Sequence, residues 1–117
     1  MTTRADEYAA VGRELLEKAR EALEEDDLIQ ASEKLWGAAA QMVKSVAERR
    51  GWPHDGHREL FRVVSRLVQE TGDASFRDLF HTANSLHWNF YEHWMDRDHV
   101  EQGLVRVQEL VGMLEQT

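Results

Sequence analysis

One short segment, from Asn84 to Trp94, holds most of the side chains that could do chemistry. Its sequence, NSLHWNFYEHW, contains four aromatic residues, two histidines, two asparagines and one glutamate. A helix that only buries an apolar stripe uses aliphatic residues, because these have no polar atom that needs a hydrogen-bond partner. The segment therefore predicts a place where rings and hydrogen-bonding groups meet a ligand or a second protein, formed by Asn84, His87, Trp88, Asn89, Tyr91, Glu92 and Trp94.

Two uses of these aromatic rings are possible. Trp88, Tyr91 and Trp94 could form a platform on which a base stacks, which contributes ~1–3 kcal/mol per base, while Asn89 and Glu92 read its edge. They could instead form an interface, because Trp and Tyr are enriched among the residues that dominate binding between proteins. The chain has four Trp and two Tyr, more than one core of this size needs. The composition therefore favours a homodimer interface.

A catalytic role would rest on the histidines. Metal-free cleavage of RNA needs a base, an acid and a cation for the phosphorane charge. His81 or His87 could act as the base, since an unperturbed imidazole titrates near neutral pH, and Arg77 could hold the phosphate. On a helix, Arg77, His81 and Asn84 share one exposed line, whereas His87 lies on a more buried side. Two alternatives stay open: that the exposed line is only solvated, and that His87 is a core histidine bonded to a neighbouring helix.

The same residue types argue against a metal site. Di-iron bundles use two Glu-x-x-His motifs on separate helices, and this chain has none. Asp96 and His99 are spaced for a metal, but they lie at a helix junction, where Asp is a routine cap. The absence of cysteine excludes disulfides and thiolate zinc sites. We therefore expect no metal and no cofactor.

Charge is distributed unevenly along the chain. The net charge is −8, and residues 1–30 carry nine acids against four bases. The sign reverses between residues 44 and 66, where Arg58, Arg62 and Arg66 recur along one predicted helix. Such a basic ridge could hold a phosphate or an acidic partner, although three arginines can also simply solvate a helix face.

Apolar residues recur at steps of three and four along the whole chain, and no stretch alternates as a strand does. The predicted helices cover about residues 5–25, 28–50, 57–70, 74–94 and 99–114, with Asp73 as the cap of the fourth. Gly37, in the middle of the second helix, predicts a close approach by a neighbouring helix. Five helices with short connections predict an all-α, up-and-down bundle.

The length of 117 residues indicates one domain, residues 1–117. No apolar run approaches the roughly 20 residues that a membrane span needs, and the N-terminus has no apolar signal region. We therefore expect a cytoplasmic protein that does not enter the membrane.

Two motifs resemble those of the small archaeal paralogous-repeat (PaREP-type) proteins: EKLWGAAA at residues 33–40 and NFYE at residues 89–92. The resemblance extends over about residues 5–115. Those proteins in turn resemble the HEPN class of helical bundles, in which a helix rich in small residues precedes an Arg-Gly turn and a His-led helix, here Arg50-Gly51 and His57. The resemblance implies a HEPN-like bundle, often dimeric, that handles RNA or nucleotides. Members act as metal-independent ribonucleases or as partners of a nucleotidyltransferase.

The ribonuclease motif of that class is not intact in this chain. It places an Arg before the late His with four to six residues between them, but Phe80, His81 and Thr82 stand at the positions where His87 would require the Arg. We therefore predict a homodimeric module that binds a nucleotide, RNA or a partner protein. A ribonuclease using His81 or His87 is one alternative. A scaffold is another, because residues 19–40 resemble a tetratricopeptide helix pair, although that pattern is not repeated.

Overall fold

Helices follow one another along almost the whole chain in the computed structural model, which describes residues 1–117. The five helices are α1 (Arg4–Glu24), α2 (Leu28–Arg50), α3 (Gly56–Thr71), α4 (Ser75–Glu92) and α5 (Arg97–Glu115). The predicted all-α bundle of five helices is confirmed. None of these helices has the length and apolar content that a membrane crossing requires.

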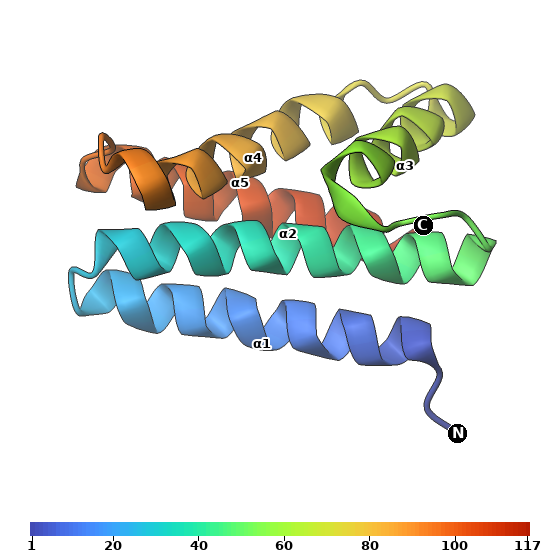
Figure 1. The fold of residues 1–117 in the computed structure, drawn as a ribbon, viewed down its shortest axis with the longest axis horizontal. Coiled ribbons are helices and arrows are strands. Elements are labelled where there is room, and N and C mark those ends of the chain that lie inside the picture. The colour runs from blue at the N-terminus through green and yellow to red at the C-terminus, as the bar shows by residue number, and fades with distance from the viewer.

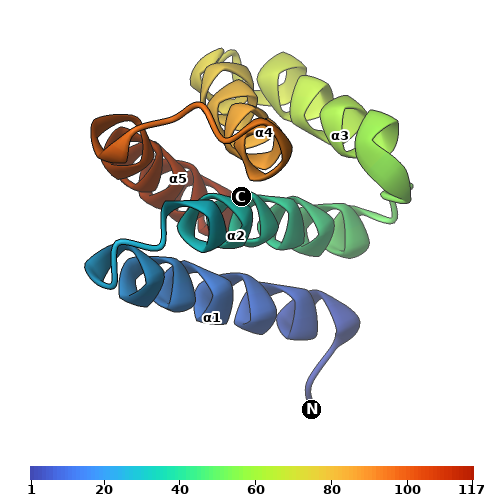
Figure 2. The same ribbon diagram turned by 60° about the vertical axis from the view of Figure 1, so that its left-hand side comes forward.

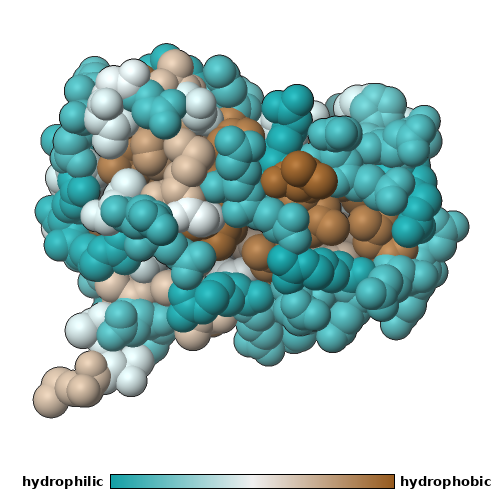
Figure 3. All heavy atoms as spheres, turned by 180° about the vertical axis from the view of Figure 1, so that it is seen from behind, coloured by the Kyte–Doolittle hydropathy of each residue, from teal (hydrophilic) through white to brown (hydrophobic).

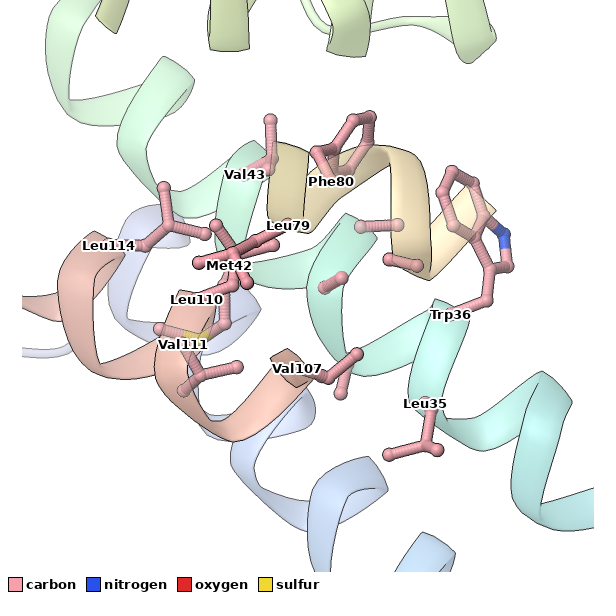
Figure 4. Packing of buried hydrophobic residues seen from close by; sticks show 14 of the residues in the cluster. Leu35, Trp36, Met42, Val43, Leu79, Phe80, Val107, Leu110, Val111 and Leu114 are labelled. Carbon is pink, nitrogen blue, oxygen red and sulfur yellow. The ribbon is translucent and has the colours of Figure 1, made fainter. Parts of the chain in front are cut away.

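Helix α2 lies at the centre and packs against all four other helices. α1 runs alongside it, α3 and α4 lie on its opposite side, and α5 lies behind it (Figures 1 and 2). Figure 4 shows apolar side chains of α2 meeting those of α4 and α5. Three consecutive alanines of α2, at positions 38–40, are buried, so neighbouring backbones can approach this helix closely from several sides.

Glycines in the middle of helices mark close approaches between neighbouring helices. A Cβ atom on Gly37 would lie 3.0 Å from Cδ1 of Leu15 in α1, which confirms the predicted close approach at this position. A Cβ atom on Gly103 of α5 would lie 2.8 Å from both methyl carbons of Leu86 in α4. Leu86 is completely buried, and the absence of a side chain at Gly103 lets α4 and α5 pack closely at this point.

Glycines also end helices as the sequence predicted. Gly51 follows α2 and Gly72 follows α3, both with the left-handed backbone that glycine favours (φ 70° and 75°). The predicted cap Asp73 does hold the start of α4, since its Oδ1 atom accepts the N–H of Ser75 at 2.9 Å. The N-cap position itself is occupied by Ala74, one residue later than predicted.

Helix α4 ends earlier than predicted. We expected it to continue through Trp94, but it stops at Glu92, and His93 takes a left-handed conformation with φ 54°. The cause is the side chain of Asn89, whose Oδ1 atom accepts the N–H groups of Trp94 at 2.9 Å and of Met95 at 2.8 Å. The amide replaces the helical acceptors and turns the chain out of α4.

The other end of the Asn89 side chain binds α2. Its Nδ2 atom donates to Oγ of Ser32 at 2.9 Å, and that hydroxyl donates to the carbonyl of Leu28 at 2.8 Å. Asn89 and Ser32 are both completely buried. A buried polar chain of this kind is stabilising only when every member is satisfied, so it fixes the position of α4 on α2.

The close packing at Gly103 can be tested with two substitutions in α5. Gly103→Ala should destabilise the protein by about 1–2 kcal/mol, because the new methyl group overpacks the contact with Leu86. Gly112→Ala is the matched control, because a Cβ atom there meets nothing within 4 Å. It should stabilise the protein by up to about 1 kcal/mol through its better helix propensity. Denaturant unfolding of both variants measures these changes; equal effects of the two substitutions would contradict the packing argument.

The role of Asn89 can be tested by Asn89→Ala. The substitution leaves two backbone N–H groups without their acceptor and removes the N–H that the Ser32 hydroxyl accepts, so we expect a loss of about 2–4 kcal/mol in the free energy of unfolding. Hydrogen exchange should become faster at the amides of Trp94 and Met95 in particular. Asn84→Ala in the same helix is the control and should cost clearly less, because the buried Oδ1 atom of Asn84 has no partner to lose.

Candidate functional site

Three segments that are far apart in the sequence meet where α3 begins against α2 and α4. Trp36 comes from α2, His57 from the first turn of α3 and His87 from α4. The rings of Trp36 and His57 are stacked, with centroids 4.7 Å apart and planes inclined by 18°. His87 lies 5.2 Å from His57 and 5.0 Å from Trp36 between ring centroids. We call this group, together with Glu33 and Tyr91, the junction cluster.

A carboxylate orients one imidazole of the junction cluster. Oε2 of Glu33 lies 3.2 Å from Nδ1 of His87, and their side chains are 33% and 19% exposed. The Nδ1–H tautomer of His87 would donate to this carboxylate and leave the lone pair of Nε2 free. The exposed imidazole of His57 stands beside it, and the ring of Tyr91 meets His87 edge-on at 5.4 Å. Such an arrangement can accept a proton at one imidazole and deliver one from another.

A groove lies between α4 and α5 on another side of α4. Its volume is about 510 Å³. Leu86 and Gly103 contribute to its lining, as does Trp94, which is 53% exposed and meets the ring of His99 at 5.1 Å. Further along the two helices the groove is lined by His81 and Arg106, among other residues. Seen from behind, where α5 faces the viewer, the surface carries a band of hydrophobic side chains set among hydrophilic ones (Figure 3).

The α4–α5 connection positions the ring of Trp94 in this groove. Asn89 holds the backbone of Trp94 on one side, and Asp96 caps α5 on the other. Oδ1 of Asp96 lies 2.8 Å from Nδ1 of His99 and accepts the His99 N–H at 3.2 Å. The hydrogen bond with the His99 ring, and to a smaller extent the one with the His99 backbone, lowers the pKa of Asp96. Asp96 and His99 thus form the predicted cap, and no group of three metal-binding side chains occurs in the structure.

The structure corrects part of the predicted aromatic platform. Asn89 is completely buried, and its oxygen and nitrogen atoms bind groups within the chain, so its amide cannot read the edge of a ligand. The rings of Trp88, Tyr91 and Trp94 do not form one platform, because Tyr91 contacts the junction cluster and Trp94 contacts the groove. Trp88, 54% exposed, and Glu92, also exposed, belong to neither site.

The structure also separates the predicted catalytic residues. His87 belongs to the junction cluster, whereas His81 lines the groove, with its ring 5.5 Å from that of Phe61 in α3. Arg77 is exposed and forms no ion pair. Asn84 is half-buried on α4, one turn before His87. The two histidines therefore serve different sites, and Arg77 is not held near either of them by another residue.

The basic ridge on α3 is not a row of three free cations. Nη1 of Arg62 binds Oε1 of Glu59 at 3.1 Å, and the guanidinium of Arg66 lies over the ring of Trp52, 4.8 Å from its centroid. Only Arg58 is exposed without such a partner. The α2–α3 connection, which carries Trp52, is at the opposite end of the molecule from the α4–α5 connection (Figure 1). Arg66, which packs on Trp52, therefore does not contribute to the groove at Trp94.

Several members of both sites were not predicted from the sequence. Glu33 and Trp36 stand at i and i+3 on α2, a spacing that places them on one face, but nothing in the sequence pairs them with residue 87. His57 was noted only as the first residue of a family-like motif. The groove residues His99 and Arg106 recur on one face of α5 and could have been found by that spacing.

Comparisons with known proteins agree with this architecture. A crystal structure of a protein from Sulfolobus solfataricus resembles the chain with a TM-score of 0.76 and 23% sequence identity, over 99% of this chain and 97% of that one. At this identity the likeness shows the fold alone. No curated protein matches the chain. The pattern of the archaeal PaREP1/PaREP8 family matches residues 7–111, nearly the whole length, and the chain therefore belongs to this family.

Proposed function

We propose that the protein is a binding module that takes a ring-bearing anionic ligand, of the size of a nucleotide, in the α4–α5 groove. One observation carries this proposal: the half-exposed indole of Trp94 and the unpaired guanidinium of Arg106 line the same groove. An exposed indole offers a stacking surface, and an unpaired arginine offers donors for phosphate. The volume of about 510 Å³ lies in the range usual for small-molecule sites, roughly 300–1,000 Å³.

The order of groups along α5 fits the order of groups in a nucleotide. His99, beside Trp94, and Arg106 are two helical turns apart, which corresponds to about 10 Å along the axis. Asp98 lines the groove near Trp94 and disfavours a phosphate there. The base would therefore stack on Trp94, and the phosphate would reach Arg106.

The proposed module is a homodimer. Trp88 and Tyr91 are 54% and 65% exposed, and neither lines the groove. Large exposed aromatic side chains are enriched where proteins bind each other. A dimer that buries these two rings would leave the groove accessible. The resemblance to the HEPN class further predicts that RNA or a nucleotidyltransferase is a partner, and this remains a prediction.

The groove can be tested by Trp94→Ala. Titration of the four common nucleoside monophosphates into the purified protein, followed by calorimetry, measures affinity. Loss of one stacking contact of ~1–3 kcal/mol should weaken the best of these ligands by about five- to 150-fold. Trp88→Ala is the matched control, because Trp88 is equally exposed but outside the groove. It should leave affinity unchanged.

The same variants separate the ligand site from the interface. Trp88→Ala combined with Tyr91→Ala should shift the protein from dimer to monomer in light scattering, whereas Trp94→Ala should remain dimeric. Equal losses of nucleotide affinity in Trp88→Ala and Trp94→Ala would reject the groove as the site. A wild-type protein that is monomeric at high concentration would reject the interface.

The junction cluster supports a second candidate, acid–base catalysis of RNA cleavage. The observation in its favour is the contact of 3.2 Å between Glu33 and His87, with His57 beside it. Glu33 would hold the tautomer and orientation of His87, which would take the proton from a ribose hydroxyl. His57 would then protonate the leaving oxygen. This arrangement does not use the arginine motif that the chain lacks.

Cleavage of a fluorescent RNA by single variants tests this candidate. Removal of a general base or acid costs about 10²–10⁴-fold in rate, so His87→Ala and His57→Ala should each lose at least about 10²-fold. Glu33→Gln should lose less, because it keeps a hydrogen-bonding oxygen. His81→Ala should retain full activity, since His81 faces the groove. Thermal melting confirms that each variant is folded; no cleavage by the wild type, or unchanged cleavage by His87→Ala, ends the catalytic hypothesis.

A further inference from the structure

Two arginines lie over one tryptophan at the corner where α2 passes into α3. The guanidinium of Arg50 lies 5.2 Å from the centroid of the Trp52 ring, and that of Arg66 lies 4.8 Å from it. A guanidinium over an indole ring is attracted by the ring electrons, and this contact does not use its N–H groups as hydrogen-bond donors to an acceptor atom.

The two arginines differ in what their N–H groups bind. Nη1 of Arg50 binds Oε1 of Glu70 at 2.6 Å, and this hydrogen bond lowers the pKa of Glu70. Nη2 of Arg50 also donates to the carbonyl of Thr117 at 3.4 Å, so Arg50 ties α2 to α3 and to the end of the chain. Arg66 has no carboxylate or carbonyl partner. Its guanidinium lies over the Trp52 ring, and its N–H groups have no acceptor within the chain.

A small cavity lies beside these donors. Its volume is about 200 Å³, and Trp52, Pro53 and Val63 give it an apolar wall. Its charged lining consists of Arg66, Arg62 and Glu59. With two cations and one carboxylate in the lining, the cavity carries net positive charge on a protein whose overall charge is −8. We call this cavity the Trp52 pocket.

We propose that the Trp52 pocket binds a terminal phosphate group, with Arg66 as its main ligand and Arg62 as a second one. The planar fork of an arginine matches two oxygens of a phosphate. The pocket is below the range usual for whole small-molecule ligands, which favours an anionic end group over a complete nucleotide. The site does not depend on the proposed groove ligand, because the two connections lie at opposite ends of the molecule (Figure 1).

Glu59 competes with the phosphate for Arg62. Its carboxylate binds Nη1 of Arg62 at 3.1 Å, and the Arg62 side chain is 65% exposed, so it can turn toward a ligand. An incoming phosphate must displace this carboxylate or tolerate its charge. Removal of the charge at position 59 should therefore strengthen binding, an effect that loss of structure would not produce.

The experiment titrates inorganic phosphate and methyl phosphate into the full chain at constant ionic strength, with chloride as the balancing salt and ³¹P NMR as the readout. Arg66→Ala should weaken binding at least about tenfold, the effect of losing a charge-assisted hydrogen bond. Arg66→Lys keeps the charge but loses the planar fork of donors, so its phosphate affinity should lie between those of the wild type and Arg66→Ala. Glu59→Gln should tighten binding several-fold. Arg58→Ala is the matched control, since Arg58 is on the same helix but outside the pocket, and should change affinity less than about twofold.

Each other outcome would overturn the proposal. Equal weakening by Arg58→Ala and Arg66→Ala would show a general charge effect instead of a pocket. Unchanged or weaker binding in Glu59→Gln would remove the role of Arg62. Binding of inorganic phosphate without binding of methyl phosphate would exclude a phosphate monoester. If the wild-type protein shows no phosphate binding at constant ionic strength, the site is rejected altogether.

Discussion

The buried amide of Asn89 is the contact on which the arrangement of α4 depends. One side of it holds Ser32 in α2, and the other side takes the two N–H groups that follow the end of α4. A fully buried amide is expensive unless its partners are all present, so the contact permits one position of α4 on α2 and one path for the chain after it. This path brings Trp94 to the groove, and it leaves His87, on a different side of α4, to face the junction with α2 and α3.

The arrangement of the helices also depends on small residues, because these let several helices approach α2 and one another closely. The buried alanines at positions 38–40 and Gly37 have short or no side chains, so other helices can pack close to the backbone of α2. Gly103 does the same for α5 where it meets Leu86. Where helices pack this closely, little cavity volume remains in the core, and open space occurs at the edges between helices. Both the groove and the Trp52 pocket lie at such edges, each beside an aromatic ring that follows the end of a helix.

Periodicity was enough to predict five helices and most of their ends, because each helix has a regular apolar stripe and glycines that stop it. It failed at the end of α4, since a side chain that accepts backbone N–H groups five and six residues ahead leaves no trace in the apolar pattern. It also failed to join Glu33 with His87, which are 54 positions apart. The sequence shows the arginines of α3 as a basic stretch, but the contacts of Arg62 with Glu59 and of Arg66 with Trp52 depend on side-chain geometry that the sequence does not show. Local sequence thus predicts elements, whereas sites that combine several elements require the packing.

Charge limits which ligands these sites can take. At net −8, the protein as a whole repels a long polyanion, and nine of its acids lie in the first 30 residues. A small anion meets only the charges within about 10 Å at 0.1 M salt, because more distant charges are screened. Arg106 and Arg66 are both exposed and have no carboxylate partner, so each can present its guanidinium to one phosphate. The charge distribution is therefore more compatible with the small phosphate-bearing ligands proposed above than with the alternative proposal of catalysis on long RNA at the junction cluster.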